Sequence, residues 1–449
     1  MNILILGAGN AGTYLATKLS AERHNITVVD TDENAINRIQ SRLDVGTLIG
    51  DACQPDILTQ AGISKTDLLL AVTNRDEVNI LSCALAHLAG VRNTVARVAH
   101  PQSYRKQTTF DLQKLGIDLL ISQKEECAIE IYNILRMPGT IEAIDLFDGK
   151  AIVAGMKVHM DSPMLLQKLK TFSRPDLLDE VRFIALLRGG ELILATGNTQ
   201  FMIGDEVYFV ATADAIRPFL KWAHPEHEPF ERIIICGGGD LGLELASKLE
   251  GGGMKVTLVE RDEIRAQSCA GHLDKTLVIL GDALQQETLA NLDINHHTAV
   301  VAATGDDETN IMICLLAEEA GASFTLAQVA KPDYVPIINN LSLLDRAVSS
   351  HMSLINSILH FVRGKHVQAV SIPHRLPGEF IEMNLPESHS WCGKAIRDLK
   401  LGSGLMVAMV FREGILRPAV GTLTLKARDQ LILYASPGAA TKLADRLNH

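Results

Sequence analysis

The sequence predicts an α/β protein in which two doubly wound, parallel-sheet domains are each followed by a small α+β module. Three observations support this fold class. A strand-length apolar run enters Gly-x-Gly-x-x-Gly twice, at residues 3–12 and 233–242. The two copies are 230 positions apart, and this spacing persists with one residue of drift as far as Arg97 and Gln328. The segments after the two copies also match each other, so we expect a duplicated chain of four domains.

Each glycine turn has the context of a Rossmann dinucleotide-binding fingerprint. It opens a segment whose apolar residues recur at helical spacing. The first glycine permits the tight turn, the second admits a pyrophosphate, and the third lets the helix pack on the strand. Amides at the helix start, reinforced by the helix dipole, then hold the phosphates. The predicted binding residues are Gly7, Ala8, Gly9, Asn10, Ala11 and Gly12, and in the second copy Gly237, Gly238, Gly239, Asp240, Leu241 and Gly242.

A carboxylate ends the next predicted strand of each copy. Asp30 lies 18 residues after Gly12, and Glu260 lies 18 residues after Gly242. A carboxylate at this place accepts hydrogen bonds from ribose hydroxyls and repels a 2′-phosphate, which favours NAD(H) over NADP(H). The choice between NAD⁺ and NADH stays open. ATP and ADP stay open as well, because both present an adenosine ribose and a pyrophosphate.

The elements follow in the order that this architecture requires. The first Rossmann domain covers residues 1–135, with strands expected at 3–6, 26–30, 47–49, 68–73 and 94–98, and the second covers residues 231–364. The small modules cover residues 140–222 and 367–449. In the first module we expect strands at 152–158, 181–188, 191–195 and 207–211, and a helix near 164–172. Residues 222–230, with two prolines and two histidines, are predicted to form a linker.

Composition limits the possible partners and the compartment. The net charge of −11 argues against nucleic acid and against anionic lipid. No apolar stretch reaches the roughly 18–20 residues of a membrane span, and the first residues lack the basic region of a signal peptide. The seven scattered cysteines are odd in number and form no Cys-x-x-Cys, which indicates reduced thiols in a cytoplasm.

This domain order, together with these motifs, resembles the tandem RCK proteins over essentially the whole chain. Besides the glycine turns and Asp30, the resemblance depends on Gly50-Asp51-Ala52, on Val72-Thr73-Asn74 with Asp76, Glu77 and Asn79, and on Ala96-Arg97. In the second copy, Asp282, Thr304, Asp307, Glu308 and Asn310 match Asp51, Thr73, Asp76, Glu77 and Asn79. The resemblance adds Asp51, Thr73, Asn74, Arg97, Asp282 and Thr304 to the predicted nucleotide sites.

The resemblance also implies a function. The small modules correspond to RCK-C regulatory modules, and the family binds nicotinamide or adenine nucleotides. Its members are cytoplasmic, lie peripherally on the inner membrane, form homo-oligomeric rings and regulate a potassium-translocating membrane subunit (TrkH/TrkG-like). Gln328 stands where the first copy has Arg97, and Gly305 where it has Asn74. We therefore expect the second site to bind more weakly or to prefer another nucleotide.

We predict no catalytic residue and no metal site. The two modules share no reactive residue, and their matched Asp205 and Asp429 are expected to stabilise turns. His224 and His227 read as solvated linker residues, Cys236 as a buried structural thiol, and the acidic run at 306–308 as a helix first turn. The alternatives are an NAD-dependent oxidoreductase of unknown substrate and a regulator of a different cation or efflux channel.

Overall fold

The computed structural model describes residues 1–21, 24–105, 112–147, 149–225, 230–341, 343–363, 369–371, 373, 376–399, 401–437 and 439. The chain divides into two compact units. One unit contains residues 1–131 and 231–359, and the other contains residues 132–230 and 360–449. Within the described residues, no helix is both long enough and apolar enough to cross a membrane.

The first Rossmann domain contains a six-stranded sheet in the order β3-β2-β1-β4-β5-β6, with every neighbouring pair parallel. Its strands are β1 (Asn2–Leu6), β2 (Asn25–Asp30), β3 (Gly46–Ile49), β4 (Leu68–Ala71), β5 (Asn93–Arg97) and β6 (Leu119–Ile121). Its helices are α1 (Asn10–Ala21), α2 (Glu33–Gln40), α3 (Pro55–Gln60), α4 (Asp76–Leu88), α5 (Gln102–Arg105) and α6 (Gln123–Leu135), with 3-10 turns at Ile63–Lys65 and Leu112–Leu115. The central strand β4 is buried along its whole length, as a parallel sheet covered on both faces requires.

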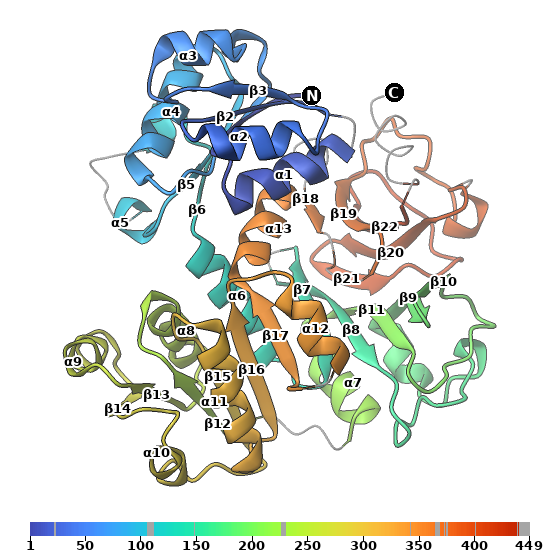
Figure 1. Ribbon diagram of the computed structural model, residues 1–449. Helices are drawn as coiled ribbons and strands as arrows, with labels where there is room; N and C mark the ends of the chain where they lie inside the picture. The colour runs from blue at the N-terminus through green and yellow to red at the C-terminus, as the bar shows by residue number, and fades with distance from the viewer. Residues whose placement is uncertain are drawn as a thin grey trace. The chain divides into compact units, whose positions relative to one another are not determined.

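The second Rossmann domain repeats this topology in the order β14-β13-β12-β15-β16-β17, again parallel (Figure 1). Its strands are β12 (Arg232–Cys236), β13 (Val256–Glu260), β14 (Leu277–Leu280), β15 (Thr298–Ala302), β16 (Phe324–Val329) and β17 (Arg346–Ser349). Its helices are α8 (Asp240–Gly251), α9 (Glu263–His272), α10 (Gln286–Ala290), α11 (Asp307–Glu319), α12 (Tyr334–Leu341) and α13 (Ser350–Arg363). The doubly wound, duplicated fold class is therefore confirmed.

The second unit contains two antiparallel sheets of identical topology, β10-β9-β11-β8-β7 and β21-β20-β22-β19-β18. The first consists of β7 (Thr140–Leu146), β8 (Ala151–Lys157), β9 (Val181–Arg188), β10 (Glu191–Leu194) and β11 (Glu206–Thr212), with helix α7 (Ile216–Ala223). The second consists of β18 (Ala369–Ser371), β19 (Glu379–Asn384), β20 (Leu405–Arg412), β21 (Ile415–Pro418) and β22 (Gln430–Ala435). Buried residues of both sheets, among them Tyr208 and Tyr434, form one shared apolar cluster. The two modules therefore pack as a pair.

The helix predicted near residues 164–172 is wrong. Leu166 has a left-handed backbone (φ 63°), and only the 3-10 turns Leu169–Thr171 and Pro175–Asp179 occur in this region. The amides of Leu166 and Leu169 donate to the carbonyls of Phe201 and Thr199, at 2.9 and 3.1 Å. These cross-chain bonds replace the i→i−4 bonds of a helix.

The predicted linker also begins too early. Trp222 is in the last turn of α7, and its ring packs against the rings of Phe172 and Phe219 at centroid distances of 5.2 and 6.0 Å. Strands β6 and β7 were not predicted from the sequence. Residues 226–229 of the linker, and the predicted domain limits at 364 and 367, lie outside the described residues.

Candidate functional site

The first and third glycines of each turn are required by the backbone itself. Gly7 and Gly237 have φ of +108° and +116°, a region that side chains rarely adopt. A Cβ on Gly12 would lie 1.8 Å from the carbonyl oxygen of Gly7, and one on Gly242 would lie 1.9 Å from that of Gly237. The first turn of helix α1 or α8 can approach its strand this closely only without a side chain.

The middle glycine of each turn borders open space. A Cβ on Gly9 or Gly239 would meet no atom within 4 Å, and helices α1 and α8 begin at the next residues, Asn10 and Asp240. An anion placed there would meet the amides and the positive dipole end of a helix. This is the geometry that phosphate binding requires.

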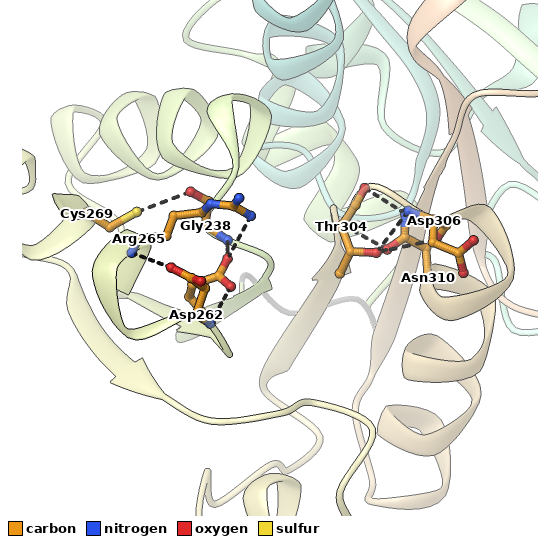
Figure 2. Close-up of polar contacts among 8 residues, drawn as sticks. Gly238, Asp262, Arg265, Cys269, Thr304, Asp306 and Asn310 are labelled. Carbon is orange, nitrogen blue, oxygen red and sulfur yellow. Dashed lines mark hydrogen bonds and ion pairs between the residues drawn. The ribbon is translucent and has the colours of Figure 1, made fainter. Parts of the chain in front are cut away.

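The acidic residue that follows each turn holds the glycine loop in place. Asp30 accepts the amide of Ala8 at 2.5 Å and the amide of Asp32 at 2.9 Å. Glu260 accepts the amide of Gly238 at 2.7 Å and that of Asp262 at 2.8 Å (Figure 2). Each carboxylate oxygen retains a second lone pair, so a ribose hydroxyl can be held without breaking these bonds.

A buried asparagine braces the opposite side of each pocket. Asn79 accepts hydrogen bonds from the amide and the hydroxyl of Thr73, at 3.0 and 2.7 Å, and donates to the carbonyl of Arg97 at 2.8 Å. Asn310 makes the same three bonds in the second copy, at 2.9, 2.6 and 2.8 Å. Figure 2 shows Thr304 and Asn310 in this contact. The brace fixes the end of β4 or β15 against the next strand.

Four aspartates shape the loops around the pockets. Asp51 accepts the amide of Cys53 at 2.9 Å, and Asp282 accepts the amide of Leu284 at 3.0 Å. Each bond stabilises the turn after the third strand of its sheet. Asp76 and Asp307 each accept an amide from the loop after the fifth strand, at 2.9 and 2.7 Å. These carboxylates support the loops at the carboxyl edge of the sheet, where doubly wound folds bind ligands.

A cavity of about 710 Å³ opens in the second Rossmann domain. It is bordered by predicted site residues, namely Gly237, Gly239, Asp240, Leu241, Glu260, Asp282 and Thr304. Its volume lies within the range of roughly 300–1,000 Å³ that small-molecule sites occupy. Gly238 and Gly242 serve the turn instead, since Gly238 donates to Glu260 and Gly242 packs under Gly237. Seven of the nine residues predicted for the second site therefore border one continuous pocket.

The two copies differ at a matched position on the fifth strand. Arg97 donates to the side-chain oxygen of Gln123 at 3.1 Å, and burial lowers the pKa of its guanidinium. Gln328 borders the cavity of the second copy and donates to the hydroxyl of Ser350 at 3.3 Å. The first pocket thus has a cation of its own on this strand, whereas the second has a neutral amide.

Two cations beside the second pocket were missed by the sequence analysis. Arg265 of α9 lies 3.9 Å from the carboxylate of Glu260, and Lys124 of α6 forms an ion pair with Asp240. Both border the cavity. Arg265 follows Glu260 by five positions, so the local sequence offered a signal for it. Lys124 and Asp240 are 116 residues apart, and no sequence pattern links them.

The other sequence candidates have structural roles. Burial raises the pKa of Cys236 to about 12, so it is a protonated thiol in β12, and none of the described cysteines forms a disulfide. Asp306 is the N-cap of α11 and accepts the amide of Thr309 at 2.8 Å, and hydrogen bonding from the side chain and then the amide of Thr309 lowers the pKa of Asp306. His224 is buried at the end of α7 and packs edge-on against His159, so the prediction of a solvated linker residue is wrong for His224. His227 lies outside the described residues. The part of the chain that the structure describes holds no metal-binding cluster.

The matched aspartates of the small modules each bind an arginine and also stabilise a turn. Asp205 accepts the amide of Met202 at 2.8 Å and two bonds from Arg188, both at 2.8 Å. Asp429 accepts the corresponding three bonds, two of them from Arg412, each at 2.7 Å. Both carboxylates are fully buried. The expected turn role is present, and the bidentate arginine is an addition that the sequence analysis missed.

Comparison with protein families gives matches in both halves. Residues 3–123 and 233–350 match the TrkA-N domain. Residues 153–224 and 380–448 match the TrkA-C domain. Together these matches cover most of the chain in the alternating order of the four sheets.

Individual relatives extend over nearly the full length. The chain is 31% identical over 443 residues to the Trk system potassium uptake protein TrkA of Azorhizobium caulinodans, covering 97% of this chain and 96% of the relative. It is also 31% identical over 439 residues to the protein of the same name from Vibrio alginolyticus, covering 97% and 95%. Among solved structures, the GsuK channel bound to NAD has the same fold, with a TM-score of 0.64 at 17% identity, covering 99% of this chain and 78% of that one.

Proposed function

This chain belongs to the TrkA family, and we propose that it is the nucleotide-binding regulatory subunit of a Trk-type potassium uptake system. It acts peripherally at the cytoplasmic face of the inner membrane, on a potassium-translocating subunit of the TrkH/TrkG kind. It assembles as a homo-oligomer, because closed symmetric rings are the common outcome of repeated domain surfaces.

The observation that carries this proposal is the duplicated arrangement of glycine turn, helix start and carboxylate. Each Rossmann domain has a helix start, an open middle glycine and a carboxylate that accepts an amide of the glycine turn, all at the carboxyl edge of its sheet. In the second domain this arrangement borders a cavity of about 710 Å³. The relatives are potassium uptake proteins, so a nucleotide in these pockets is a signal that regulates transport.

We propose NAD⁺ or NADH as the ligand of the first pocket, which Gly7, Gly9, Gly12, Asp30 and Arg97 would bind. Gly237, Gly239, Gly242 and Glu260 are their counterparts in the second pocket. The NAD-bound GsuK channel, which has the same fold, supports this choice. ADP and ATP are the competing ligands, because they share the adenosine and pyrophosphate. A ligand that prefers one arrangement of the domains shifts the population toward it and so changes the state of the attached channel.

The duplicated carboxylates in the described parts of the two modules do not favour the oxidoreductase alternative. A dehydrogenase needs an acid or base from its second domain beside the nicotinamide. The carboxylates duplicated in the modules, Asp205 and Asp429, are each bound by an arginine and buried. We therefore propose that the protein binds NADH without oxidising it, which incubation with a panel of small carbonyl acceptors would test.

The test uses one substitution in each pocket. Because a Cβ at Gly9 or Gly239 would meet no atom within 4 Å, Gly9→Asp and Gly239→Asp should fold while placing a carboxylate against the phosphates. We expect each variant to lose nucleotide binding at its own site by calorimetry. The double variant should fail to restore growth of a deletion strain at low external potassium.

Gly251→Asp is the matched control. Gly251 is exposed at the end of α8 and also has open space around its Cβ position. This variant should bind nucleotide and support potassium uptake normally. Full nucleotide binding by the Gly9→Asp/Gly239→Asp double variant would contradict the assignment of the pockets. Full potassium uptake by a double variant that binds no nucleotide would contradict the regulatory role.

A further inference from the structure

The second pocket has an acidic group where the first has an amide. Asp240 is the first residue of α8, directly after the middle glycine, and the matching residue of the first copy is Asn10. A carboxylate at this place repels the phosphates that the helix start would otherwise attract. Gln328 also provides no charge where the first copy has Arg97. The second pocket therefore needs a cation at its phosphate end.

Lys124 brings a cation to this place from the other Rossmann domain. Its ammonium forms an ion pair with the carboxylate of Asp240 and borders the cavity. The two side chains are 50% and 49% exposed, so the pair faces solvent on the cavity side. An ammonium has three N–H donors. Lys124 can therefore hold Asp240 and a phosphate oxygen at the same time.

Helix α6 is held in position by its contact with helix α13. Side-chain hydrogen bonds join them from Gln123 to Ser350 at 2.9 Å, from Ser357 to Glu126 at 2.6 Å and from Ser353 to Glu130 at 2.6 Å, and Nε2 of Gln123 also lies 3.4 Å from Nδ1 of His351. The bonding positions on α6 are spaced by three and four residues, so they lie along one face. Lys124 follows Gln123 in the first turn, and its backbone is positioned by this contact.

The reciprocal position of the second copy carries no permanent charge. Ser349-Ser350-His351 matches Ser122-Gln123-Lys124, which places His351 where α6 has Lys124. The Nδ1 atom of His351 lies 2.9 Å from the carbonyl oxygen of Ala330. Burial lowers the pKa of this imidazole, so it is mainly neutral at pH 7. The first pocket depends on its own Arg97, whereas the second receives Lys124 from its neighbour.

We propose that Lys124 is a phosphate-binding residue of the second nucleotide site, so that a nucleotide there bridges the two Rossmann domains. This inference rests on the proposed function, because it takes the second pocket to hold a nucleotide. A pyrophosphate at the start of α8 adds negative charge beside Asp240, and Lys124 contacts both. Occupancy of the second site then restrains α6, the helix through which the chain leaves the first Rossmann domain.

The experiment isolates the second site in the full chain carrying Gly9→Asp. Calorimetry with NADH and with ADP measures the affinity that remains. Loss of a charge-assisted phosphate contact should weaken binding roughly tenfold or more in Lys124→Ala, and Lys124→Arg should retain most of the affinity. Lys248→Ala is the matched control, because Lys248 is on α8 but pairs with Glu244 at 3.2 Å. It should leave the affinity unchanged.

A second pair of variants separates phosphate binding from neutralisation of Asp240. Asp240→Asn alone should tighten binding, because the repelling carboxylate is gone. In that background Lys124→Ala should still weaken binding. A loss of the Lys124 effect in Asp240→Asn would show that the lysine only neutralises the aspartate and would overturn the proposal.

Two further outcomes separate this inference from the proposed function. Second-site affinity that does not respond to Lys124→Ala would overturn the inference and leave the proposed function standing. Complete loss of nucleotide binding in Gly9→Asp alone would show that the second pocket holds no nucleotide, which overturns both the inference and the two-site proposal. In the Gly239→Asp background, Lys124→Ala should leave first-site affinity unchanged. A fall there as well would show a merely structural lysine and would also overturn the inference.

Discussion

The first pocket has Asn10 at its helix start and Arg97 on its fifth strand, whereas the second has Asp240 and Gln328 at these places. The asparagine brace, in contrast, is the same in both copies. Asn79 and Asn310 are both fully buried, and three of their hydrogen bonds differ in length by at most about 0.1 Å, whereas the bond to the threonine carbonyl is 3.0 Å in the first copy and 3.4 Å in the second. The copies agree in the groups that hold the sheet edge together and differ in the groups that face a ligand.

The energetic reason for this division is the cost of an unpaired buried group. Removing one partner of a buried hydrogen bond costs about 1–3 kcal/mol, whereas an exposed substitution usually changes stability by less than about 0.5 kcal/mol. Charges at the pocket can therefore change without loss of the fold. The two sites share one scaffold and differ in charge at the helix start and on the fifth strand.

The largest effect is expected at the third glycine of each turn. Gly12→Ala and Gly242→Ala each force a methyl group against a backbone carbonyl oxygen, so the helix must move away from its strand. We expect each variant to lose about 3 kcal/mol of stability in its own domain. Hydrogen exchange measured separately over β1–α1 and β12–α8 would resolve the two domains.

Gly251→Ala is the control for these variants. It adds the same methyl group to α8 where there is open space, and it should be neutral or stabilise by up to about 1 kcal/mol. If Gly12→Ala or Gly242→Ala left exchange protection unchanged, the close approach of helix and strand would not be what requires a glycine.

The second prediction tests whether the braces are equivalent. Asn79→Ala and Asn310→Ala each leave buried donors and acceptors near Thr73 or Thr304 unpaired. Each should destabilise its domain by about 2 kcal/mol, and by similar amounts. Urea unfolding followed by domain-resolved hydrogen exchange is the measurement, with the exposed Asn37→Ala as control. A strongly unequal pair would show that the two scaffolds are not interchangeable.

The third prediction concerns the carboxylates at the ribose end. Asp30→Ala and Glu260→Ala each remove the carboxylate that accepts a hydrogen bond from the glycine loop and that we propose accepts one from the ribose. Each should weaken nucleotide binding at its own site by about 1–3 kcal/mol and leave the other site unchanged. Calorimetry on each variant, with the other pocket blocked by Gly239→Asp or Gly9→Asp, gives the two affinities. Unchanged affinity would remove that carboxylate from the site.

Local sequence was sufficient to predict the turns, the carboxylates and most sheet strands. Each of these features is determined within one strand–turn–helix segment of about 30 residues, as in Gly7 to Asp30. Local sequence was insufficient to predict the structure of residues 164–172. Their apolar spacing is compatible with a helix, but their amides bond to residues 197–201 instead. Tertiary hydrogen bonds outweigh local propensity in such a segment.

Contacts between the two copies could not be predicted either. The ion pair of Lys124 with Asp240 and the side-chain hydrogen bonds between α6 and α13 join residues more than 100 positions apart. Each duplicated unit reads as complete by itself, so its sequence gives no sign that a neighbour contributes to its pocket. The arginines that bind Asp205 and Asp429 were missed for a related reason, because the partners stand on different strands.

The fourth prediction converts the second pocket toward the first. Gln328→Arg combined with Ser350→Gln reproduces the arginine and the side-chain oxygen that holds it in the first copy, where Arg97 bonds to Gln123. The added cation should tighten nucleotide binding at the second site by roughly 1.5 kcal/mol, about tenfold. Calorimetry in the Gly9→Asp background measures it, with Ser350→Gln alone as control. Two sites of equal wild-type affinity, with no response to this change, would show that the strand position does not distinguish them.

The smallest effect is expected at the matched pair Lys124 and His351. Burial lowers the pKa of His351 below its ordinary value of 6.5, and the positive charge of Arg97 lowers it further. The hydrogen bond to Ala330 and the negative charge of Asp307 raise this pKa, but by less. The unfolded chain therefore binds the proton more readily than the folded one. The contribution of the neutral His351 side chain to the free energy of unfolding is complete above pH 6.5 and is lost as the pH falls toward the folded-state pKa.

We expect the melting temperature of wild type to fall more steeply between pH 7.5 and 5.5 than that of His351→Gln. The Lys124→Ala variant should keep the wild-type slope, because a lysine remains charged throughout this range. The difference between the two variants isolates the imidazole from the other histidines, which all three proteins share. Equal slopes in wild type and His351→Gln would place the proton-sensitive group elsewhere. The two copies would then differ in charge at this position without differing in their response to pH.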